Sequence, residues 1–326
     1  MLLTNIGELV TFQGKTAQRG KAMAEPLVLH NVALRIEGEH IVEILPMDQL
    51  SKEEKKSGYD CQGKLVTPGF VDSHTHFIFG GSRAKEAALR RAGASYMDIM
   101  EAGGGIQYTV DHTRKASFDE LYCQGEKRLN QFLSLGITTV EGKSGYGLDE
   151  ETELRQLEVM AKLKEDHPMD IALTYMGPHA LPREYKDRQE EFMDFQCDVM
   201  LPKVKDLVDF ADIFTEKNVF ELEESKRYLK AAKDLGIKRK VHADEIVTLG
   251  GAELAVAMEA TSADHLLQVS EEGIKALAQG DTIATLLPLT AFSLKEDYAP
   301  ARRLIDAGCA VALATDYNPG SCHSMS

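Results

Sequence analysis

Apolar and polar residues alternate over short distances in the first 66 residues of the chain. The stretch LVLHNVALRIEGEHIVEILP holds two alternating runs separated by Gly38 and Glu39, the pattern of two strands joined at a hairpin tip. Period-two alternation turns one face of a strand toward a core and the other toward water. Residues 1–66 are therefore predicted to form a small β-sandwich-like domain.

From Leu65 onward, short β-rich runs alternate with longer amphipathic segments, which is typical of βα units and a parallel sheet. The segment 150–165 carries acidic residues in its first turn, and the segment 222–235 stops at Gly236, as helices commonly do. Eight β-rich runs are present: 65–71, 137–143, 171–176, 208–214, 240–242, 263–267, 282–286 and 311–315.

Eight such runs predict an α/β fold, a (β/α)8 TIM-like barrel over residues 67–326. A barrel of this kind has a helix after every strand, yet only about ten residues follow Thr315. We therefore expect the barrel to be incomplete at its C-terminal end, with the last helix missing.

Composition and charge narrow the range of partners. The 326 residues include 37 basic and 52 acidic side chains, a net charge of -15 that would repel nucleic acid and anionic membranes. No apolar run is long enough to span a bilayer, and no signal peptide is evident at the N-terminus. The five cysteines are scattered and odd in number, which argues against a disulfide framework and favours the cytoplasm.

Residues with catalytic chemistry stand at the ends of the predicted strands. Active sites of TIM barrels are built at the carboxyl ends of the strands, so these side chains should meet at one mouth. The two histidines of an H-x-H pair in an extended segment point to the same side and can reach one metal ion. The strand-end residues are His74 and His76, His179, His242, His265 and Asp316.

Histidines with an aspartate form a set suited to Zn²⁺ or iron, with a position left for water. Such a cation lowers the pKa of water toward neutrality and polarises a carbonyl group. The pattern therefore indicates metal-dependent hydrolysis.

The ligand order resembles the amidohydrolase superfamily. The strings TPGFVDSHTHFIFGGSRAKE, AGGGI, TTVEGKSGYGLD, GPHALPREY, VHADE, ADHL and ATDYNPGS resemble the imidazolonepropionase family more narrowly, in the expected order from residue 67 to 321. The resemblance implies hydrolysis of 4-imidazolone-5-propanoate to N-formimino-L-glutamate in histidine degradation. It also implies that a segment closing the small β domain is missing after residue 326.

Carried over position by position, the resemblance implies two sets of site residues. The metal ligands are His74, His76, His242 and Asp316, and the substrate contacts are Arg83, Tyr146, His179, Glu245, Asn318, Gly320 and Ser321. The implied content is one Zn²⁺ or iron ion per chain. The expected partner is the small-molecule substrate, and a homodimer is the candidate assembly.

Each polar side chain suits one part of this chemistry. The fork of Arg83 matches the propanoate carboxylate, Tyr146 can donate from a glycine-flanked loop, and His179 can donate to the developing oxyanion. The catalytic set is Glu245, His265 and Asp316. Glu245 would carry a proton to the departing nitrogen, His265 would orient or deprotonate water, and Asp316 would bind metal and accept a proton.

Two positions qualify the resemblance. Lys143 stands at a strand end where some amidohydrolases carbamylate a lysine to bridge two metals, but in this family the site is expected to hold one metal. Gly142 stands where the family usually has a bulkier residue.

Two rival interpretations stay open from the sequence. One is an inactive truncated fragment that at most binds metal. The other is a related amidohydrolase that acts on another cyclic amide or on a nucleobase.

Overall fold

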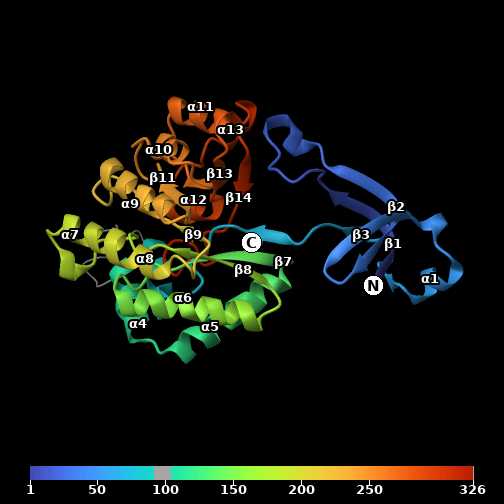
Figure 1. Ribbon diagram of the computed structural model, residues 1–326, viewed down its shortest axis with the longest axis horizontal. Helices are drawn as coiled ribbons and strands as arrows, with labels where there is room; N and C mark the ends of the chain where they lie inside the picture. The colour runs from blue at the N-terminus through green and yellow to red at the C-terminus, as the bar shows by residue number, and fades with distance from the viewer. Residues whose placement is uncertain (92–103, 326) are drawn as a thin grey trace. The chain divides into compact units, whose positions relative to one another are not determined.

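Residues 1–69 form the first of two units in the computed structural model, which describes residues 1–91 and 104–325. Two residues of the AGGGI string, Ala102 and Gly103, lie outside the described residues. The second unit begins at Phe70 and holds every predicted site residue. Figure 1 shows the elements of each unit.

The first unit is one sheet with strands in the order β3-β2-β1-β4, and β5 also pairs with β1. The predicted hairpin is confirmed, because β2 and β3 pair on either side of Gly38, whose φ is 58°. Ile6, Leu9, Val32 and Leu34 form its core. The small β domain predicted at the N-terminus is present as this one sheet. The elements are β1 Leu2–Thr11, η1 Gly20–Ala24, β2 Leu27–Glu37, β3 His40–Pro46, η2 Met47–Gln49, α1 Lys52–Ser57, β4 Tyr59–Asp60 and β5 Leu65–Val66.

The second unit confirms the predicted α/β barrel. Its strands are all parallel and follow one another around the sheet in chain order. They are β6 Phe70–Asp72, β7 Ile137–Lys143, β8 Asp170–Tyr175, β9 Phe210–Ala211 with β10 Phe214–Thr215, β11 Lys238–Ala243, β12 Ser262–His265, β13 Ile283–Leu286 and β14 Val311–Leu313.

Two predicted strands need correction. The run 65–71 is divided, because Leu65 and Val66 pair with β1 in the first unit while the barrel strand begins at Phe70. The run 208–214 is divided into β9 and β10 around Asp212, whose buried side chain is drawn to the ammonium group of Lys143, 2.7 Å away. The backbone stays hydrogen-bonded between the two pieces, because the N–H of Asp212 donates to the carbonyl of Tyr175 and the carbonyl of Ile213 accepts from the N–H of His242.

The barrel closes between its first and last strands just beyond their ends. Thr75 bridges Tyr317, and the backbone N–H of Asp316 donates to the carbonyl of His74 at 2.9 Å. The carboxylate of Asp72 accepts from both the N–H and the hydroxyl of Thr315, at 3.1 and 2.6 Å. These contacts bring residues about 240 positions apart in sequence into one layer.

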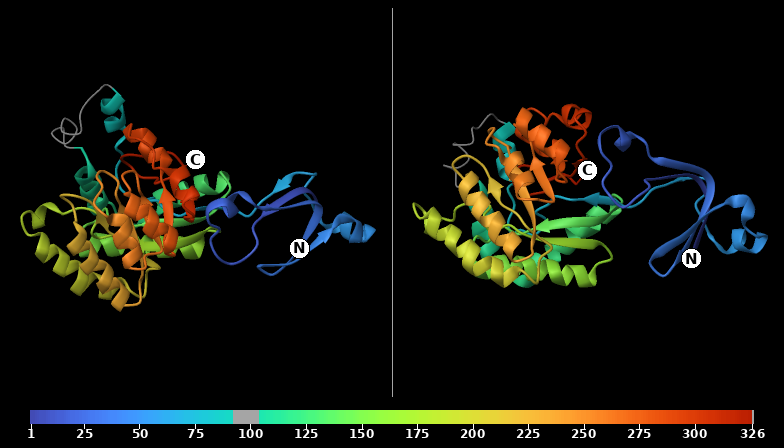
Figure 2. Two further views of the ribbon diagram at one scale, coloured as in Figure 1. Left: turned by 90° about the horizontal axis from the view of Figure 1, so that it is seen from above. Right: turned by 45° about the horizontal axis from the view of Figure 1, so that its top comes forward.

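Helices lie outside the strands, as both views in Figure 2 show. The predicted helices at 150–165 and 222–235 are confirmed as α6 and α9. The carboxylate of Asp149 caps α6 by accepting from the N–H of Thr152 at 2.8 Å, and α9 ends before Gly236, whose φ is 78°. The helical elements are α2 Ala84–Arg91, α4 Ile106–Lys115, α5 Phe118–Ser134, α6 Glu150–Asp166, η3 Arg183–Tyr185, α7 Gln189–Asp194, η4 Phe195–Met200, α8 Leu201–Val204, α9 Leu222–Asp234, α10 Gly251–Ala257, α11 Glu271–Gln279, α12 Pro288–Leu294 and α13 Ala301–Asp306.

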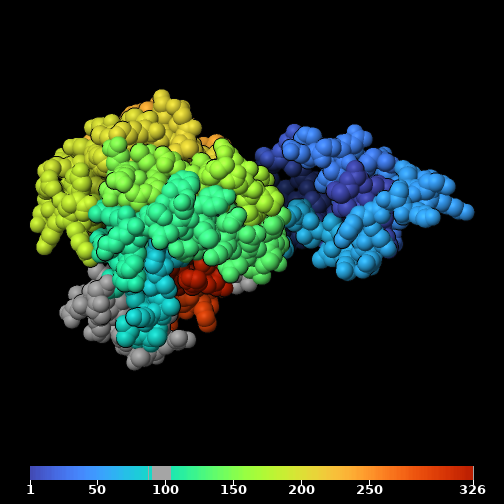
Figure 3. All heavy atoms as spheres, turned by 90° about the horizontal axis from the view of Figure 1, so that it is seen from below, coloured from blue at the N-terminus to red at the C-terminus, as the bar shows by residue number. Residues whose placement is uncertain are grey.

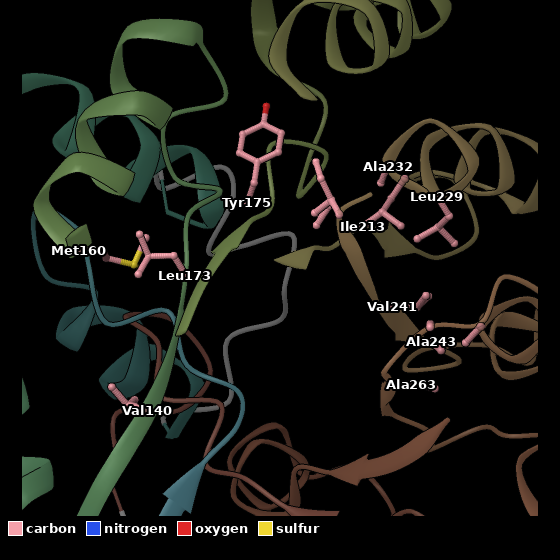
Figure 4. Packing of buried hydrophobic residues seen from close by; sticks show 14 of the residues in the cluster. Val140, Met160, Leu173, Tyr175, Ile213, Leu229, Ala232, Val241, Ala243 and Ala263 are labelled. Carbon is pink, nitrogen blue, oxygen red and sulfur yellow. The ribbon is translucent and has the colours of Figure 1, made fainter. Parts of the chain in front are cut away.

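The core lies between the strands and these helices. Figure 4 shows Met160 of α6 beside Leu173 of β8. Full burial of a side chain of this size contributes roughly 1.5–3 kcal/mol. A Cβ atom on Gly142 of β7 would lie 2.5 Å from both Met160 Sδ and the ring of Phe77. Met160 and Phe77 therefore occupy the space that a bulkier residue at 142 would need.

No helix among residues 1–91 and 104–325 combines the length and apolar character needed to cross a bilayer. All five cysteines are free thiols.

Candidate active site and metal centre

A cavity of about 640 Å³ opens where the barrel strands end. His74 lies outside its wall and is fully buried, and Gly320 packs against Arg83. All the other predicted site residues line the cavity: His76, Arg83, Tyr146, His179, His242, Glu245, His265, Asp316, Asn318 and Ser321. The barrel thus brings the predicted set together.

Three histidines and one aspartate meet in the depth of this cavity. Asp316 Oδ1 lies 3.5 Å from His74 Nε2 and 3.7 Å from His76 Nε2. The ring centroid of His242 lies 4.5 Å from that of His74 and 5.8 Å from that of His76. Donor atoms of His74, His76 and Asp316 lie within 4.8 Å of one another, as do those of His74, His242 and His265.

The chemistry of these side chains fits a metal ion. Among the described residues, the buried Nε2 atom of His74 has no hydrogen-bond partner. A buried lone pair without a donor costs about 1–3 kcal/mol. A cation at this point would satisfy it, and imidazole nitrogens with a carboxylate oxygen are ligands of Zn²⁺ and iron.

Carboxylates behind the cluster orient two of the histidines. Asp264 Oδ2 lies 2.6 Å from His74 Nδ1, so Nδ1 carries the proton and Nε2 presents a lone pair to the cluster. Asp212 Oδ2 lies 3.0 Å from His242 Nδ1, at ion-pair distance. Burial, with the charge of Lys143, holds the pKa of His74 well below its usual value, which keeps its ring neutral.

Asp316 is held in an unusual backbone conformation. Its φ is 52°, in the left-handed region. The hydrogen bond from its backbone N–H to the carbonyl of His74, which helps to close the barrel, keeps it there. The hydroxyl of Thr290 donates to Asp316 Oδ2 at 2.7 Å, which leaves Oδ1 directed at the histidines. Burial raises the pKa of Asp316 to about 6, partly offset by the hydrogen bond from Thr290.

Glu245 and His265 lie together beside the cluster. Glu245 Oε1 is 3.5 Å from His265 Nδ1. Burial and the neighbouring carboxylate of Asp316 raise the pKa of Glu245 to about 8, while burial and the charge of His242 hold the pKa of His265 well below its usual value. At neutral pH this pair therefore consists of a protonated carboxyl group and a neutral imidazole.

Asp244 explains how a short string can carry both His242 and Glu245 to one cavity. Its φ is 50°, and its carboxylate accepts backbone N–H bonds at the start of α10, from residues 249 to 252, at 2.9–3.1 Å. This cap turns the chain sharply after β11. The side chain of Asp244 thus shapes the loop, while His242 and Glu245 line the cavity.

The loop that carries Tyr146 is anchored from α6. The carboxylate of Glu153 accepts from the N–H groups of Gly145, Gly147 and Leu148 at 2.8–3.1 Å. Gln156 accepts from the N–H of Tyr146 at 3.2 Å. Burial raises the pKa of the Tyr146 hydroxyl, so the group keeps its proton and can donate a hydrogen bond to a substrate atom.

His179 presents an acceptor to the cavity. Its Nδ1 lies 3.0 Å from the carbonyl of Gly145, which can only accept, so Nδ1 carries the proton. Burial and the charge of His242 lower the pKa of His179 to about 3, so the ring is neutral and Nε2 bears a lone pair. A neutral ring in this tautomer can accept a hydrogen bond at Nε2, whereas donation to an oxyanion was predicted.

Arg83 is held in position in the wall of the cavity. Its Nε and Nη2 donate to the carboxylate of Glu86 at 2.9 and 2.8 Å. A Cβ atom on Gly320 would lie 2.1 Å from Arg83 Nη1, so only glycine admits the guanidinium group at this distance. Figure 3 shows the red C-terminal segment at the surface beside the cyan segment that leads from Arg83 into α2.

Asn318 shapes the loop that contains Gly320. Its Oδ1 accepts from the N–H groups of Gly320 and Ser321, both at 2.8 Å. Its Nδ2 donates to the carbonyl of Asp316 at 2.7 Å. Asn318 therefore connects Asp316, a member of the histidine–aspartate cluster, to Gly320, which packs against Arg83.

Several wall residues were not predicted from the sequence. They share no motif, and the apolar ones are indistinguishable in sequence from core residues. Only the path of the chain around the mouth brings them to the cavity. They are Ile106, Phe214, Ile246, Leu267, Ser293, Leu294, Lys295 and Glu296.

Known proteins of related sequence match this chain over 98–100% of its length. A family profile described as the amidohydrolase family matches residues 58–107. The imidazolonepropionase of Parabacteroides distasonis is 50% identical over 100% of this chain and 80% of its own length. That of Phocaeicola vulgatus is 54% identical over 98% of this chain and 78% of its own length. That of Clostridium tetani is 52% identical, with the same coverage.

Solved structures share the fold at low sequence identity. A triazine hydrolase from Arthrobacter aurescens matches with a TM-score of 0.67 at 14% identity, over 98% of this chain and 73% of its own. An adenosine deaminase from Xanthomonas campestris with bound zinc matches with a TM-score of 0.52 at 17% identity, over 97% of this chain and 68% of its own. These likenesses concern the fold.

Proposed function

The chain belongs to the imidazolonepropionase family of amidohydrolases, and we propose how its site opens the ring of 4-imidazolone-5-propanoate. It is a hydrolase of carbon–nitrogen bonds in cyclic amides. Water adds to the ring carbonyl carbon, the bond from this carbon to the ring nitrogen breaks, and N-formimino-L-glutamate is formed. The nucleobase and inactive-fragment alternatives are not favoured by relatives that match the whole chain.

The observation that carries the proposal is the buried cluster of His74, His76, His242 and Asp316 at the barrel mouth. We propose that these four side chains hold one Zn²⁺ or iron ion. Such an ion supplies a Lewis acid, which acidifies water and polarises the amide carbonyl.

Arg83, His179 and Tyr146 orient the substrate in the cavity. The Arg83 guanidinium, held by Glu86, takes the propanoate carboxylate through charge-assisted hydrogen bonds. The lone pair on His179 Nε2 accepts a ring N–H, and the Tyr146 hydroxyl donates to an acceptor of the substrate. The substrate is thus fixed by two donors, Arg83 and Tyr146, and one acceptor, His179.

Proton transfer uses the three catalytic side chains in turn. As water attacks the carbonyl carbon, Asp316 accepts a proton from it. Glu245, protonated at neutral pH, gives its proton to the ring nitrogen as the carbon–nitrogen bond breaks. His265, 3.5 Å from Glu245, returns the proton from Asp316 to Glu245. The enzyme then regains its starting protonation state.

The test is product identity. The 326-residue chain is incubated with 4-imidazolone-5-propanoate, and N-formimino-L-glutamate is followed by NMR. Parallel samples with guanine and cytosine are assayed for ammonia. The proposal expects N-formimino-L-glutamate and no ammonia, and ammonia release from a nucleobase without ring opening would contradict it.

We further propose that the chain works in the cytoplasm, which its five free thiols support, and that it assembles as a homodimer. Light scattering on the purified protein tests the assembly.

A further inference from the structure

A network of five buried charged side chains lies behind the histidines of the site. Lys143 Nζ donates to Asp212 Oδ2 at 2.7 Å and to Glu141 Oε1 at 2.9 Å, and lies 3.8 Å from Asp264 Oδ2. Lys240 Nζ donates to Glu141 Oε2 at 2.7 Å and lies 3.4 Å from Asp264 Oδ2. None of the five side chains is more than 5% exposed.

The charges of this network do not cancel. Three carboxylates face two ammonium groups, which leaves one negative charge in a buried region. Burying ions is costly, and such pairs are seldom retained for stability alone. The uncompensated charge lies next to the rings of His74 and His242, on the side where the cation is proposed to bind.

Lys143 occupies the centre of the carboxylates. Its Nζ contacts all three, while Lys240 contacts only Glu141 and Asp264 and also donates to the carbonyl of Ser73 at 2.6 Å. Asp212 and Asp264 are in turn the partners of His242 and His74. The ammonium group of Lys143 therefore holds in place Asp212 and Asp264, the carboxylates next to the proposed ligands His242 and His74.

Two features indicate that the space around this ammonium group could accept a metal ion. Donor atoms of His74, Glu141 and Asp264 lie within 4.8 Å of one another. Asp264 is fully buried, and its Oδ1 has no hydrogen-bond partner in the described part of the chain. Carboxylate oxygens are the ligands that Mg²⁺ and Mn²⁺ prefer.

We propose that Lys143 is a positioning residue whose ammonium group occupies a latent second cation site formed by Glu141, Asp212 and Asp264. Its fixed single charge keeps that site closed to a divalent ion, so the chain holds one metal. Without Lys143, the remaining four groups carry two negative charges, which matches a divalent cation. The inference rests on the metal centre proposed above.

The test is metal stoichiometry in Lys143→Met. The 326-residue wild type and variant are stripped with a chelator, loaded with excess Mn²⁺, freed of unbound metal by gel filtration and analysed for bound metal. We expect one equivalent in the wild type and two in Lys143→Met. Mn²⁺ should raise the melting temperature of the variant by a larger increment than that of the wild type, because a second ion binds only the folded state.

Two variants control the result. Lys162→Met makes the same chemical change on the exposed face of α6 and should bind one equivalent, like the wild type. Glu141→Gln added to Lys143→Met removes one carboxylate charge and should return the content to one equivalent. If Lys143→Met does not fold without metal, Mn²⁺ must restore its folding, while Lys162→Met needs none.

Binding of a single ion by folded Lys143→Met, or failure of Mn²⁺ to restore folding, would overturn the inference. A wild type that binds no metal would instead overturn the proposed metal centre. The two failures are therefore distinguishable.

Discussion

Burial decides which protonation state each side chain of the site offers. Removal from water raises the pKa of a carboxyl group and lowers that of an imidazole, because both shifts favour the neutral form. Glu245 and Asp316 follow the first rule, with pKa values raised to about 8 and about 6, and His179 follows the second, with a pKa near 3. The site therefore offers one proton donor and several lone pairs at neutral pH.

The state of Glu245 predicts a pH dependence. Because its pKa is raised to about 8, the carboxyl group is protonated below that pH and loses its proton as the pH rises through it. The value of kcat should fall on the alkaline side with an apparent pKa near 8. Glu245→Gln should lower kcat about 100-fold or more and abolish this alkaline limb. An unchanged alkaline limb in Glu245→Gln would assign it to another group.

Arg83 is expected to act on binding. Arg83→Lys cannot both keep the two bonds to Glu86 and reach the substrate carboxylate, because lysine lacks the planar fork. Steady-state kinetics should show KM raised by about tenfold, with kcat changed little. The matched control is Arg183→Lys, an exposed arginine paired with Asp111, which should leave both constants unchanged. A loss confined to kcat would argue against carboxylate binding by Arg83.

Individual residue types were predictable from the sequence, but their hydrogen-bonding roles were only partly so. The H-x-H pair and the strand-end positions identified the cluster, because strand ends of a barrel converge. The tautomer of His179 depends on the carbonyl of Gly145, which lies 34 residues away. Such a contact has no local signal in the chain.

At the scale of elements, loops are positioned by the helices that follow them. Glu153 and Gln156 project from α6 to the backbone of the loop that carries Tyr146, and Asp244 caps α10 directly after the strand that carries His242. Each helix thus both covers the barrel and fixes a loop of the site. Stability and substrate binding should therefore be coupled at these positions.

Glu153→Gln tests this coupling. Glu153 Oε1 accepts from all three N–H groups, and Oε2 accepts a second bond from Gly145. Gln replaces one oxygen by an NH2 donor, which in place of Oε2 faces the N–H of Gly145, at a cost of about 1–3 kcal/mol. Denaturant unfolding should show this loss, and KM should rise as Tyr146 is displaced. Glu158→Gln, on the exposed face of the same helix, is the control and should change neither. If Glu153→Gln lowers stability while KM stays constant, the loop is not a binding element.

Element boundaries show where sequence patterns reach their limit. The run 137–143 is reproduced as β7, and its apolar residues Ile137 and Val140 are buried as the pattern indicates. The run 65–71 spans two units because a continuous apolar stretch does not reveal which sheet each half pairs with. The fourth strand divides at Asp212, whose ion pair with Lys143 is invisible to periodicity.

At the scale of the whole molecule, closure of the barrel creates the site. Asp72 and Thr315 lie 243 positions apart, yet their hydrogen bonds hold the segments that carry the H-x-H pair and Asp316 side by side. The architecture was predictable from the count of βα units. The fit of Gly320 to Arg83, and of Met160 to Gly142, required the assembled structure, because each depends on a tertiary contact between distant segments.

The central claim is that this assembled cluster holds the metal on which ring opening depends. The most direct measurement is turnover of 4-imidazolone-5-propanoate by the chelator-stripped chain during stepwise addition of Zn²⁺ or Fe²⁺. We predict that stripped protein is inactive, and that activity rises linearly and reaches its plateau at one equivalent of metal per chain. Full activity in protein shown to be free of metal would contradict the account.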